Sequence, residues 1–243
     1  MKKYRRPDSR RPAELREVKI TPNFVGTAAG SCLIEMGGTR VICTASIETS
    51  VPRWLENSDK GWVTAEYSMM PASTGSRKRR PIGKPDSRSV EIQRLIGRTL
   101  RSVVNLRKMP GLSITVDCDV LEADGGTRCA SITGGMVALA IALNTARKQE
   151  LVSGRVLTGL VAAVSAGVIE NTPVLDLPYA EDSIAEVDMN VAMTSKGEFV
   201  EVQGTGEGAT FTQNQLIEML SLAKKGIRKL IKMQKLAIAS CEE

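Results

Sequence analysis

The segment 113–146 constrains the fold of this 243-residue chain most, because it joins two opposite hydrophobic patterns by a short turn. Between Ser113 and Leu121 apolar and polar residues alternate, which is typical of a strand with one buried face. Between Ala130 and Ala146 the sequence is apolar and rich in alanine, which indicates a helix buried in the core. The sequence DGGTR at 124–128 lies between them. We therefore expect a strand, a turn and a buried helix in succession.

A hairpin and an amphipathic helix are expected before this unit. Two β-prone runs, 31–36 and 39–47, are separated by a pair of glycines, which predicts a hairpin. Residues 88–105 have apolar side chains at helical spacing, and Arg94 and Arg98 lie on a different face of the same helix. The chain is thus expected to begin with antiparallel strands, followed by a helix with a basic flank.

The second half of the chain is predicted to contain more strands and a final helix. Strands are expected at 157–169, 187–193 and 199–203. The T-x-x-Q match at Thr212 is a capping box, and it predicts the start of an amphipathic helix. Neither a repeat nor a linker divides the sequence, so we expect one domain that mixes helices and strands.

Histidine does not occur in the chain. Ser-His-Asp catalysis, Cys-His catalysis and any zinc or haem site with histidine ligands are therefore excluded. Carboxylates, arginines, backbone amides and metal ions must carry any chemistry. The cysteines contain no C-x-x-C pair, and we interpret them as reduced thiols, mostly in the core: Cys32, Cys43, Cys118, Cys129 and Cys241.

The N-terminus lacks the pattern of a secretory signal. Its first residues, MKKYRRPDSRR, are basic, but no apolar segment of signal-peptide length follows them. The longest apolar runs, 134–143 and 159–169, are shorter than the roughly 18 residues that a membrane span requires. We expect a cytoplasmic protein with no membrane partner, in which these runs form a buried helix and a buried strand.

The net charge of +6 comes from two short segments. Residues 1–12 contain six basic side chains and residues 77–88 contain six more, whereas the rest of the chain is mildly acidic. Such a concentration is expected where a polyanion binds, although a solvated tail would have the same composition. Aromatic residues make up only 3% of the chain, which argues against stacking platforms for bases. Any nucleic acid would be held by its phosphates.

The DGGTR segment is a candidate anion site because it lies between a strand and a buried helix. Free amides at the helix N-terminus, two glycines, a hydroxyl and a guanidinium together suit a phosphate or sulfate, although a plain turn is the alternative. The same GGTR sequence at 37–40 lies between two strands, where we interpret it as a turn only. Neither copy has the spacing of a P-loop. The glycine-rich segment 203–208 is interpreted as a flexible loop.

A second candidate site is the acidic segment 181–190, EDSIAEVDMN. Asp188 interrupts a predicted strand on the face that it shares with Asn190, and Asp182 lies in the preceding loop, which could fold back toward it. Adjacent carboxylates repel unless they bind a hard cation such as Mg²⁺ or one of them is protonated. Alternatively, three acids of this segment are ordinary solvated residues: Glu181, Asp182 and Glu186.

Several long motifs, in their order along the chain, closely resemble the bacterial ribonuclease PH family: GWVTAEYSM at 61–69, R-x-x-EIQRLIGR at 88–98, DCDV at 117–120, ADGGTR at 123–128, ED-x-x-x-EVDMN at 181–190 and EVQGT at 201–205. The resemblance covers nearly the whole chain. It implies an α+β fold over residues 1–243, in a single ribonuclease PH-type domain that is βαβ-rich with mostly antiparallel sheets and packed helices. Within it, 1–12 would be a basic N-terminal arm and 73–84 a basic loop.

The resemblance also implies an activity and an assembly. The activity is a phosphate-dependent 3′-to-5′ exoribonuclease that trims tRNA precursors and other RNA 3′ ends. It would release nucleoside 5′-diphosphates and could run in reverse as nucleotide addition. The assembly is a homohexamer, arranged as a trimer of dimers.

Particular residues acquire roles through this resemblance. Arg88, Thr127 and Arg128 correspond to phosphate-binding residues of the family, and Gly126 belongs to the same loop. Asp182 and Asp188 correspond to its catalytic and metal-binding pair, with Mg²⁺ as cofactor and inorganic phosphate as co-substrate. From their charge we expect RNA contacts by basic residues of the loop and of the helix after it: Arg77, Lys78, Arg79, Arg80, Arg94 and Arg98.

Two alternatives belong to other classes of protein. One is an inactive RNA-binding subunit of an exosome-like ring, and the other is a polyanion-binding protein without enzymatic activity. Retention of the charged site residues Arg88, Arg128, Asp182 and Asp188 argues against the first, because a subunit without catalysis has no physical need of them. Only the charge of the chain supports the second.

Overall fold

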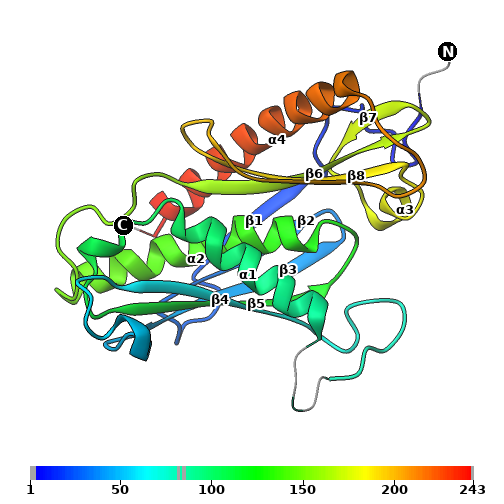
Figure 1. Ribbon diagram of the computed structural model, residues 1–243. Helices are drawn as coiled ribbons and strands as arrows, with labels where there is room; N and C mark the ends of the chain where they lie inside the picture. The colour runs from blue at the N-terminus through cyan, green and yellow to red at the C-terminus, as the bar shows by residue number, and fades with distance from the viewer. Residues whose placement is uncertain (1–3, 81–82, 84–85, 242–243) are drawn as a thin grey trace.

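The computed structural model describes residues 4–80, 83 and 86–241 (Figure 1). The first half of the chain builds one sheet, in the strand order β1-β2-β3-β5-β4. Neighbouring strands in it are antiparallel except β4 and β5, which are parallel. Its strands are β1 (Val18–Pro22), β2 (Gly30–Met36), β3 (Thr39–Glu48), β4 (Trp62–Met69) and β5 (Ser113–Glu122).

The second half builds another sheet, in the order β7-β6-β8-β9, with antiparallel pairing between neighbours. Each residue of β6 is buried, because this strand lies inside the sheet and contacts both α2 and α4. The strands are β6 (Val161–Ile169), β7 (Thr172–Leu175), β8 (Val187–Thr194) and β9 (Phe199–Gly206).

The helices pack on these sheets (Figure 1). Helix α2 lies between them, where it contacts β2 and β3 on one side and β6 on the other. Helix α1 packs on β4 beside α2, and α4 packs on β6 and β7. The helices are α1 (Ser87–Arg101), α2 (Thr127–Lys148), α3 (Tyr179–Asp182) and α4 (Gln213–Ala239), with single 3₁₀ turns at Arg53–Leu55 and Leu106–Lys108.

The position of α2 explains its composition. A helix enclosed on nearly all sides has no need of a polar face. By length and hydropathy α2 could also cross a membrane, but 89% of its most apolar window is buried inside the protein. Helix α2 is thus the buried helix that the sequence predicts, and β6 is the buried strand.

Most predicted elements are confirmed, with shifts at their ends. The hairpin consists of β2 and β3. Their pairing begins at Met36 and Thr39, next to the glycine turn, and extends to Gly30 and Ala45. The helix expected to reach residue 105 ends at Arg101, and the strand expected from residue 157 begins at Val161. The segment 203–208 is not the flexible loop that we expected, because β9 continues to Gly206 in register with β8. Strands β1, β4 and β7 and the short α3 were not predicted from the pattern.

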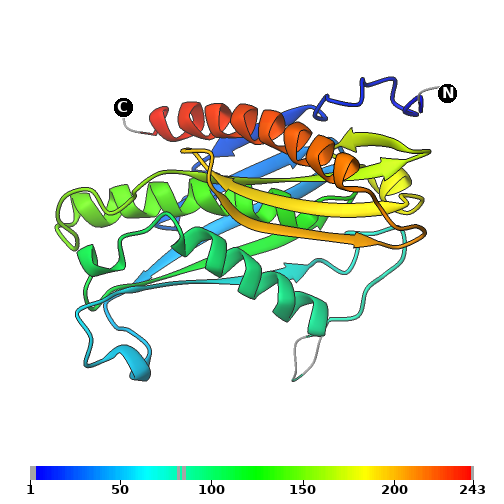
Figure 2. The ribbon, with the colours of Figure 1, turned by 45° about the horizontal axis from the view of Figure 1, so that its top comes forward.

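Part of the basic charge of the N-terminal arm is used inside the protein and is not available to a polyanion. Arg6 is 2% exposed, and its guanidinium lies 2.5 Å from a carboxylate oxygen of Glu181. Arg10 lies within 3.6 Å of the Asp176 carboxylate. Figure 2 shows this segment passing β7 and the start of α4. Glu181 is fully buried, so it is not a solvated loop acid. The two lysines at positions 2 and 3 lie outside the described residues.

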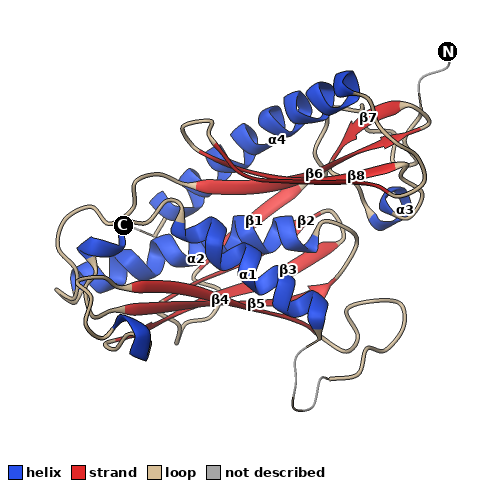
Figure 3. Cartoon of the chain, in the orientation of Figure 1, coloured by secondary structure: helices blue, strands red, loops and turns tan. Residues whose placement is uncertain are grey.

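The second basic segment behaves differently. It lies in the long loop between β4 and α1, which projects from the body of the protein (Figure 3). The position of Lys84 in this loop is outside the described residues. Four basic side chains of the loop are exposed: Arg77, Lys78, Arg79 and Arg80.

The cysteines are free thiols, as expected. Cys32, Cys43 and Cys118 face one another across β2, β3 and β5, and they are buried together with Cys129. Cys241, near the end of α4, is only partly buried.

Candidate active site

The DGGTR loop links β5 to α2 through two left-handed residues. Gly125 and Gly126 have φ values of +71° and +66°, which glycine adopts at little cost. A Cβ at position 125 would lie 2.5 Å from the carbonyl oxygen of Leu177, so this glycine also permits close packing. Helix α2 begins at Thr127, and the amides of its first turn have no partners within the helix. Together with the helix dipole, these amides favour an anion.

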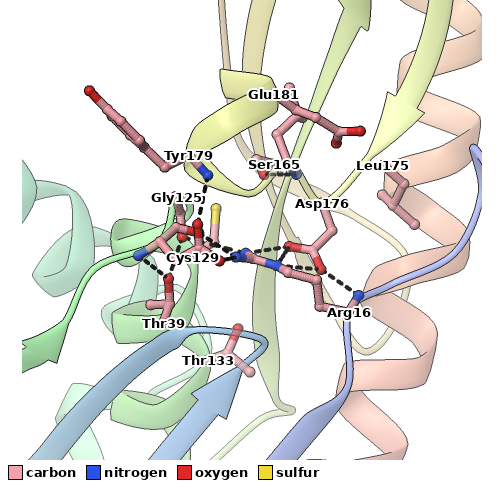
Figure 4. A network of polar contacts seen from close by, with 12 residues as sticks. Arg16, Thr39, Gly125, Cys129, Thr133, Ser165, Leu175, Asp176, Tyr179 and Glu181 are labelled. Atoms are coloured by element: carbon pink, nitrogen blue, oxygen red, sulfur yellow. Dashed lines mark hydrogen bonds and ion pairs between the residues drawn. The ribbon is translucent and has the colours of Figure 1, made fainter. Parts of the chain in front are cut away.

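Side chains from other segments hold the carbonyl side of this loop (Figure 4). The guanidinium of Arg16 donates to the carbonyl oxygens of Asp124 and Gly125 and pairs with Asp176 at 2.7 Å. The Oγ1 hydroxyl of Thr39 donates to the Gly125 carbonyl at 2.6 Å and accepts from the Asp124 amide at 2.9 Å. Thr39 belongs to the first GGTR copy. The expectation that this copy is only a turn is therefore wrong, because it also binds the second copy.

The two arginines predicted to bind phosphate lie in the first turns of α1 and α2. Arg128, in the first turn of α2, donates from Nη1 to Gln203 Oε1 at 2.9 Å and to Glu91 Oε1 at 3.3 Å. Arg88 lies in the first turn of α1, whose start is fixed by Asp86: its carboxylate accepts from the amide of residue 89 at 2.9 Å. The side chain of Arg88 is exposed, whereas Arg128 lines a small pocket between α1, α2, β8 and β9.

The acidic pair, Asp182 and Asp188, is influenced by the charges of these arginines. Asp182 is the last residue of α3, and Asp188 is the second residue of β8. Burial and then the charge of Asp182 raise the pKa of Asp188 to about 6. Burial also raises the pKa of Asp182, and Glu207 adds to this effect, whereas Arg88 and Arg128 oppose it. The fold therefore gathers the predicted acids and both predicted arginines in one region.

Among the residues that the structure describes, none donates to one oxygen of Asp188. This oxygen, Oδ1, is buried, whereas Oδ2 accepts from the side-chain Nδ2 of Asn190 at 3.5 Å. The shared face predicted for these two residues is confirmed by this contact. A buried carboxylate oxygen without a donor is costly unless it binds a cation or carries a proton.

Comparisons with known proteins identify the family. The models for domains 1 and 2 of the 3′ exoribonuclease family match residues 14–143 and 159–226. A ribonuclease PH from Corynebacterium efficiens is 54% identical over 237 residues, which is 97% of each chain. The chain belongs to the ribonuclease PH family. A second member, from Corynebacterium glutamicum, is 53% identical and also covers 97% of each chain.

Solved structures share the ribonuclease PH fold with this chain. An Archaeoglobus fulgidus exosome with RNA bound to the active site aligns with a TM-score of 0.79 at 25% identity, over 93% of this chain and 91% of that one. Rice Rrp46 aligns with a TM-score of 0.78 at 20% identity, over 96% of this chain and 100% of that one. The predicted α+β class with mostly antiparallel sheets and packed helices is confirmed.

Several residues around the site were not predicted from the sequence. The hydroxyl of Tyr67 donates to Thr127 Oγ1 at 2.9 Å and fixes that side chain. Gln203 accepts a hydrogen bond from Arg128, and the charge of Glu207 raises the pKa values of both Asp182 and Asp188. Arg16 had no distinguishing pattern around it. Alternation along 61–69 could have revealed β4, and with it the inward direction of Tyr67, whereas the other contacts join segments that are distant in sequence.

The two helical arginines expected to contact RNA are exposed on α1. Arg98 pairs with Glu201 of β9 at 2.7 Å, so it connects the helix to the second sheet. Arg94 lies one turn earlier and is exposed. Both lie on α1, the helix that carries Arg88 and that follows the basic loop directly in sequence.

Proposed function

We infer that the DGGTR loop, the two arginines and the acidic pair form one active site. The chain is a phosphorolytic 3′-to-5′ exoribonuclease of the ribonuclease PH family, with inorganic phosphate as co-substrate. One pair of contacts carries the assignment of the site: Cys129, next to Arg128 in α2, lies with its Sγ 3.3 Å from Asn190 Oδ1, and Asn190 Nδ2 lies 3.5 Å from Asp188 Oδ2. The start of α2 and the acidic strand β8 are thus side by side, and Arg88 and Arg128 both lower the pKa of Asp182.

We propose that phosphate is bound by Arg88, Gly126, Thr127 and Arg128. A phosphate oxygen attacks the phosphorus of the last phosphodiester, and the bond from that phosphorus to the preceding 3′ oxygen breaks. The 3′ oxygen takes up a proton, and a nucleoside 5′-diphosphate leaves. Because nucleophile and phosphodiester are both anionic, two guanidiniums and a helix N-terminus are needed to offset their repulsion and align them. The bond energy is conserved, so the reverse addition of nucleotides is also expected.

We propose that Asp182 and Asp188 are the catalytic acids and that they hold a divalent cation, Mg²⁺. The buried, unpartnered Oδ1 of Asp188 suits such an ion. Mg²⁺ is commonly bound by one or two carboxylates together with substrate phosphates. When bound, the ion would neutralise charge that develops on the leaving oxygen. A carboxyl of the pair that does not ligate the ion would be free to supply the proton that this oxygen takes up.

For partners, we propose tRNA precursors and other RNA 3′ ends, and a homohexamer arranged as a trimer of dimers in the cytoplasm. The exposed basic loop supports tRNA precursors as substrates, because a tRNA presents phosphates far from the 3′ end that enters the site. We further propose that residues 1–243 fold as a single domain, since α2 packs against both sheets. The inactive ring subunit is not favoured, because the chain is 54% identical to a ribonuclease PH.

The test is a phosphate dependence assay. Purified protein is incubated with a 3′-extended RNA and Mg²⁺, with and without inorganic phosphate, and the released nucleotides are identified. We expect nucleoside diphosphates that require phosphate, and loss of the reaction when EDTA removes the cation. Equal activity without phosphate, with release of monophosphates, would identify a hydrolase and overturn this mechanism.

A further inference from the structure

The first GGTR copy and the buried Arg16 take no part in the reaction proposed above. Thr39 is 0% exposed, Arg16 is 7% exposed and Asp176 is 1% exposed. Burying an ion pair costs desolvation energy, so the Arg16–Asp176 pair is weak evidence for stabilisation. Arg16 donates to the carbonyl oxygens of Asp124 and Gly125. Thr39 also donates to the Gly125 carbonyl, and it accepts from the Asp124 amide, so both side chains bind the peptide group that follows Gly125.

The geometry of a peptide unit gives these contacts a direction. In a planar trans peptide the N–H points opposite to the C=O. With the Asp124 and Gly125 carbonyls bound on the side of Arg16 and Thr39, the N–H groups of Gly125 and Gly126 point away from that side. Glycine dipeptides rotate easily, and a rotated unit would direct a carbonyl oxygen toward a bound anion and repel it.

The same contacts connect the loop to the acidic side of the site. Asp176 precedes α3, and its carboxylate accepts from the guanidinium of Arg16. The Tyr179 amide at the start of α3 donates to the Asp124 side chain at 3.0 Å. Gly125 packs against the backbone of Leu177. The loop and the helix that ends in an aspartate of the site are thus held at a fixed separation (Figure 4).

We propose that Arg16 and Thr39 are positioning residues that lock the carbonyl side of the 124–126 loop and thereby present its amides to phosphate. Neither side chain touches the substrate. The proposal rests on the proposed phosphate role of Gly126, Thr127 and Arg128, and it adds a function for the first GGTR copy. Variants of these two residues should therefore bind phosphate more weakly, and this defect should be separable from RNA binding and from the stability of the fold.

Thr39 offers the sharper variants. Thr39→Val keeps the shape of the side chain and removes both hydrogen bonds, whereas Thr39→Ser keeps the hydroxyl. Phosphorolysis of a short oligonucleotide is measured at varied inorganic phosphate and, separately, at varied RNA. For Thr39→Val we expect the KM for phosphate to rise roughly tenfold, because two buried hydrogen bonds are lost. The KM for RNA should stay unchanged, and Thr39→Ser should restore the wild-type value for phosphate.

Arg16 is tested so that a loss of stability cannot imitate the effect. Arg16→Met alone removes the closest cation from the buried Asp176 carboxylate, which keeps only Arg10 at 3.6 Å and the Arg16 backbone amide, and is expected to destabilise the protein. In the double variant Arg16→Met/Asp176→Asn the buried charge is removed, whereas asparagine tolerates the φ of +55° at this position and keeps an acceptor for the Arg16 amide, so resistance to urea should recover. The KM for phosphate should nevertheless remain high, because the Asp124 carbonyl has lost the donor that Arg16 supplies. Arg6→Lys is the matched control, since it weakens another buried ion pair that does not contact the loop.

The outcomes separate the two proposals. If Thr39→Val and the stable double variant keep the wild-type KM for phosphate while Arg128→Ala raises it, the positioning role is wrong and the phosphate site stands. If Arg128→Ala also leaves it unchanged, the proposed phosphate site itself is wrong. An equal rise in the KM for phosphate in Arg6→Lys would also overturn the positioning role, because any weakened ion pair would then have the same effect.

Discussion

Replacing Asp188 by asparagine is expected to raise the free energy of unfolding of the enzyme without ligands and, at the same time, to abolish most of its activity. The pKa of this carboxyl is raised from 3.8 to about 6, chiefly by burial and then by Asp182. The folded state therefore disfavours the ionised form. The energetic cost of that form is absent below the ordinary pKa and reaches its full value above the folded pKa, so it develops between about pH 4 and pH 6.

The magnitude follows from the shift. A difference of about 2 pKa units corresponds to about 3 kcal/mol at neutral pH. Asp188 is only partly buried, and solvent screening reduces this figure to about 1–2 kcal/mol. Asparagine nearly preserves the shape of the side chain and carries no charge. The free energy of unfolding of Asp188→Asn should therefore exceed that of the wild type by about 1–2 kcal/mol at pH 7.5.

The assay is urea unfolding, followed by tryptophan fluorescence at one protein concentration, with EDTA present and phosphate absent. The stability gained by Asp188→Asn should diminish as the pH falls and disappear near pH 4, where the wild-type carboxyl is protonated. Asp182→Asn is the companion variant, because removal of its charge should move the same transition in Asp188 to lower pH. Turnover of Asp188→Asn should fall by about 100-fold or more.

Two results would refute this reasoning. If Asp188→Asn is less stable than the wild type at pH 7.5, the carboxylate is stabilised in the fold and its pKa is not raised. If the variant gains the same stability at pH 4 and pH 7.5, the gain has no connection with ionisation. Wild-type turnover in Asp188→Asn would remove this residue from the mechanism.

Three further predictions concern the loop, the arginine and the basic segment. Arg128→Ala should raise the phosphate requirement or abolish turnover while tRNA binding largely persists; a gel-shift assay beside the kinetics checks this, and a parallel loss of both would contradict it. Gly125→Ala should destabilise the protein by about 1–3 kcal/mol in urea unfolding, because alanine is strained at a φ of +71° and its Cβ would meet the Leu177 carbonyl at 2.5 Å. Gly75→Ala, in open space on the exposed loop, is its control and should change nothing. Alanine at four loop positions should weaken the binding of tRNA precursors and reduce the slope of log affinity against log salt concentration by up to about 3 to 4. Degradation of a short oligonucleotide should change little. Equal losses of activity on both substrates, or an active monomer in sedimentation, would exclude a role of the loop away from the 3′ end. Those positions are Arg77, Lys78, Arg79 and Arg80.

The local patterns of this sequence were enough to predict the elements that carry the site. Alternation in 113–121, the apolar helix after it and the glycines between them are short-range properties, and the structure contains them as β5, the 124–126 loop and α2. The capping box at Thr212 is likewise local, and both of its hydrogen bonds are present. The long motifs that resemble the family supplied the groups that we propose as catalytic for the same reason, since each motif is contiguous.

Only the tertiary structure decided which distant groups meet. Arg16, Thr39 and Asp176 are each unremarkable in their own segment, yet Arg16 and Thr39 both bind the 124–126 loop and Asp176 pairs with Arg16. Charge composition also could not separate the arm from the basic loop: Arg6 is buried against Glu181, whereas Arg79 is exposed. A side chain's pattern in sequence reports its own backbone period, while its partner, its burial and hence its pKa depend on segments that the folded chain brings beside it.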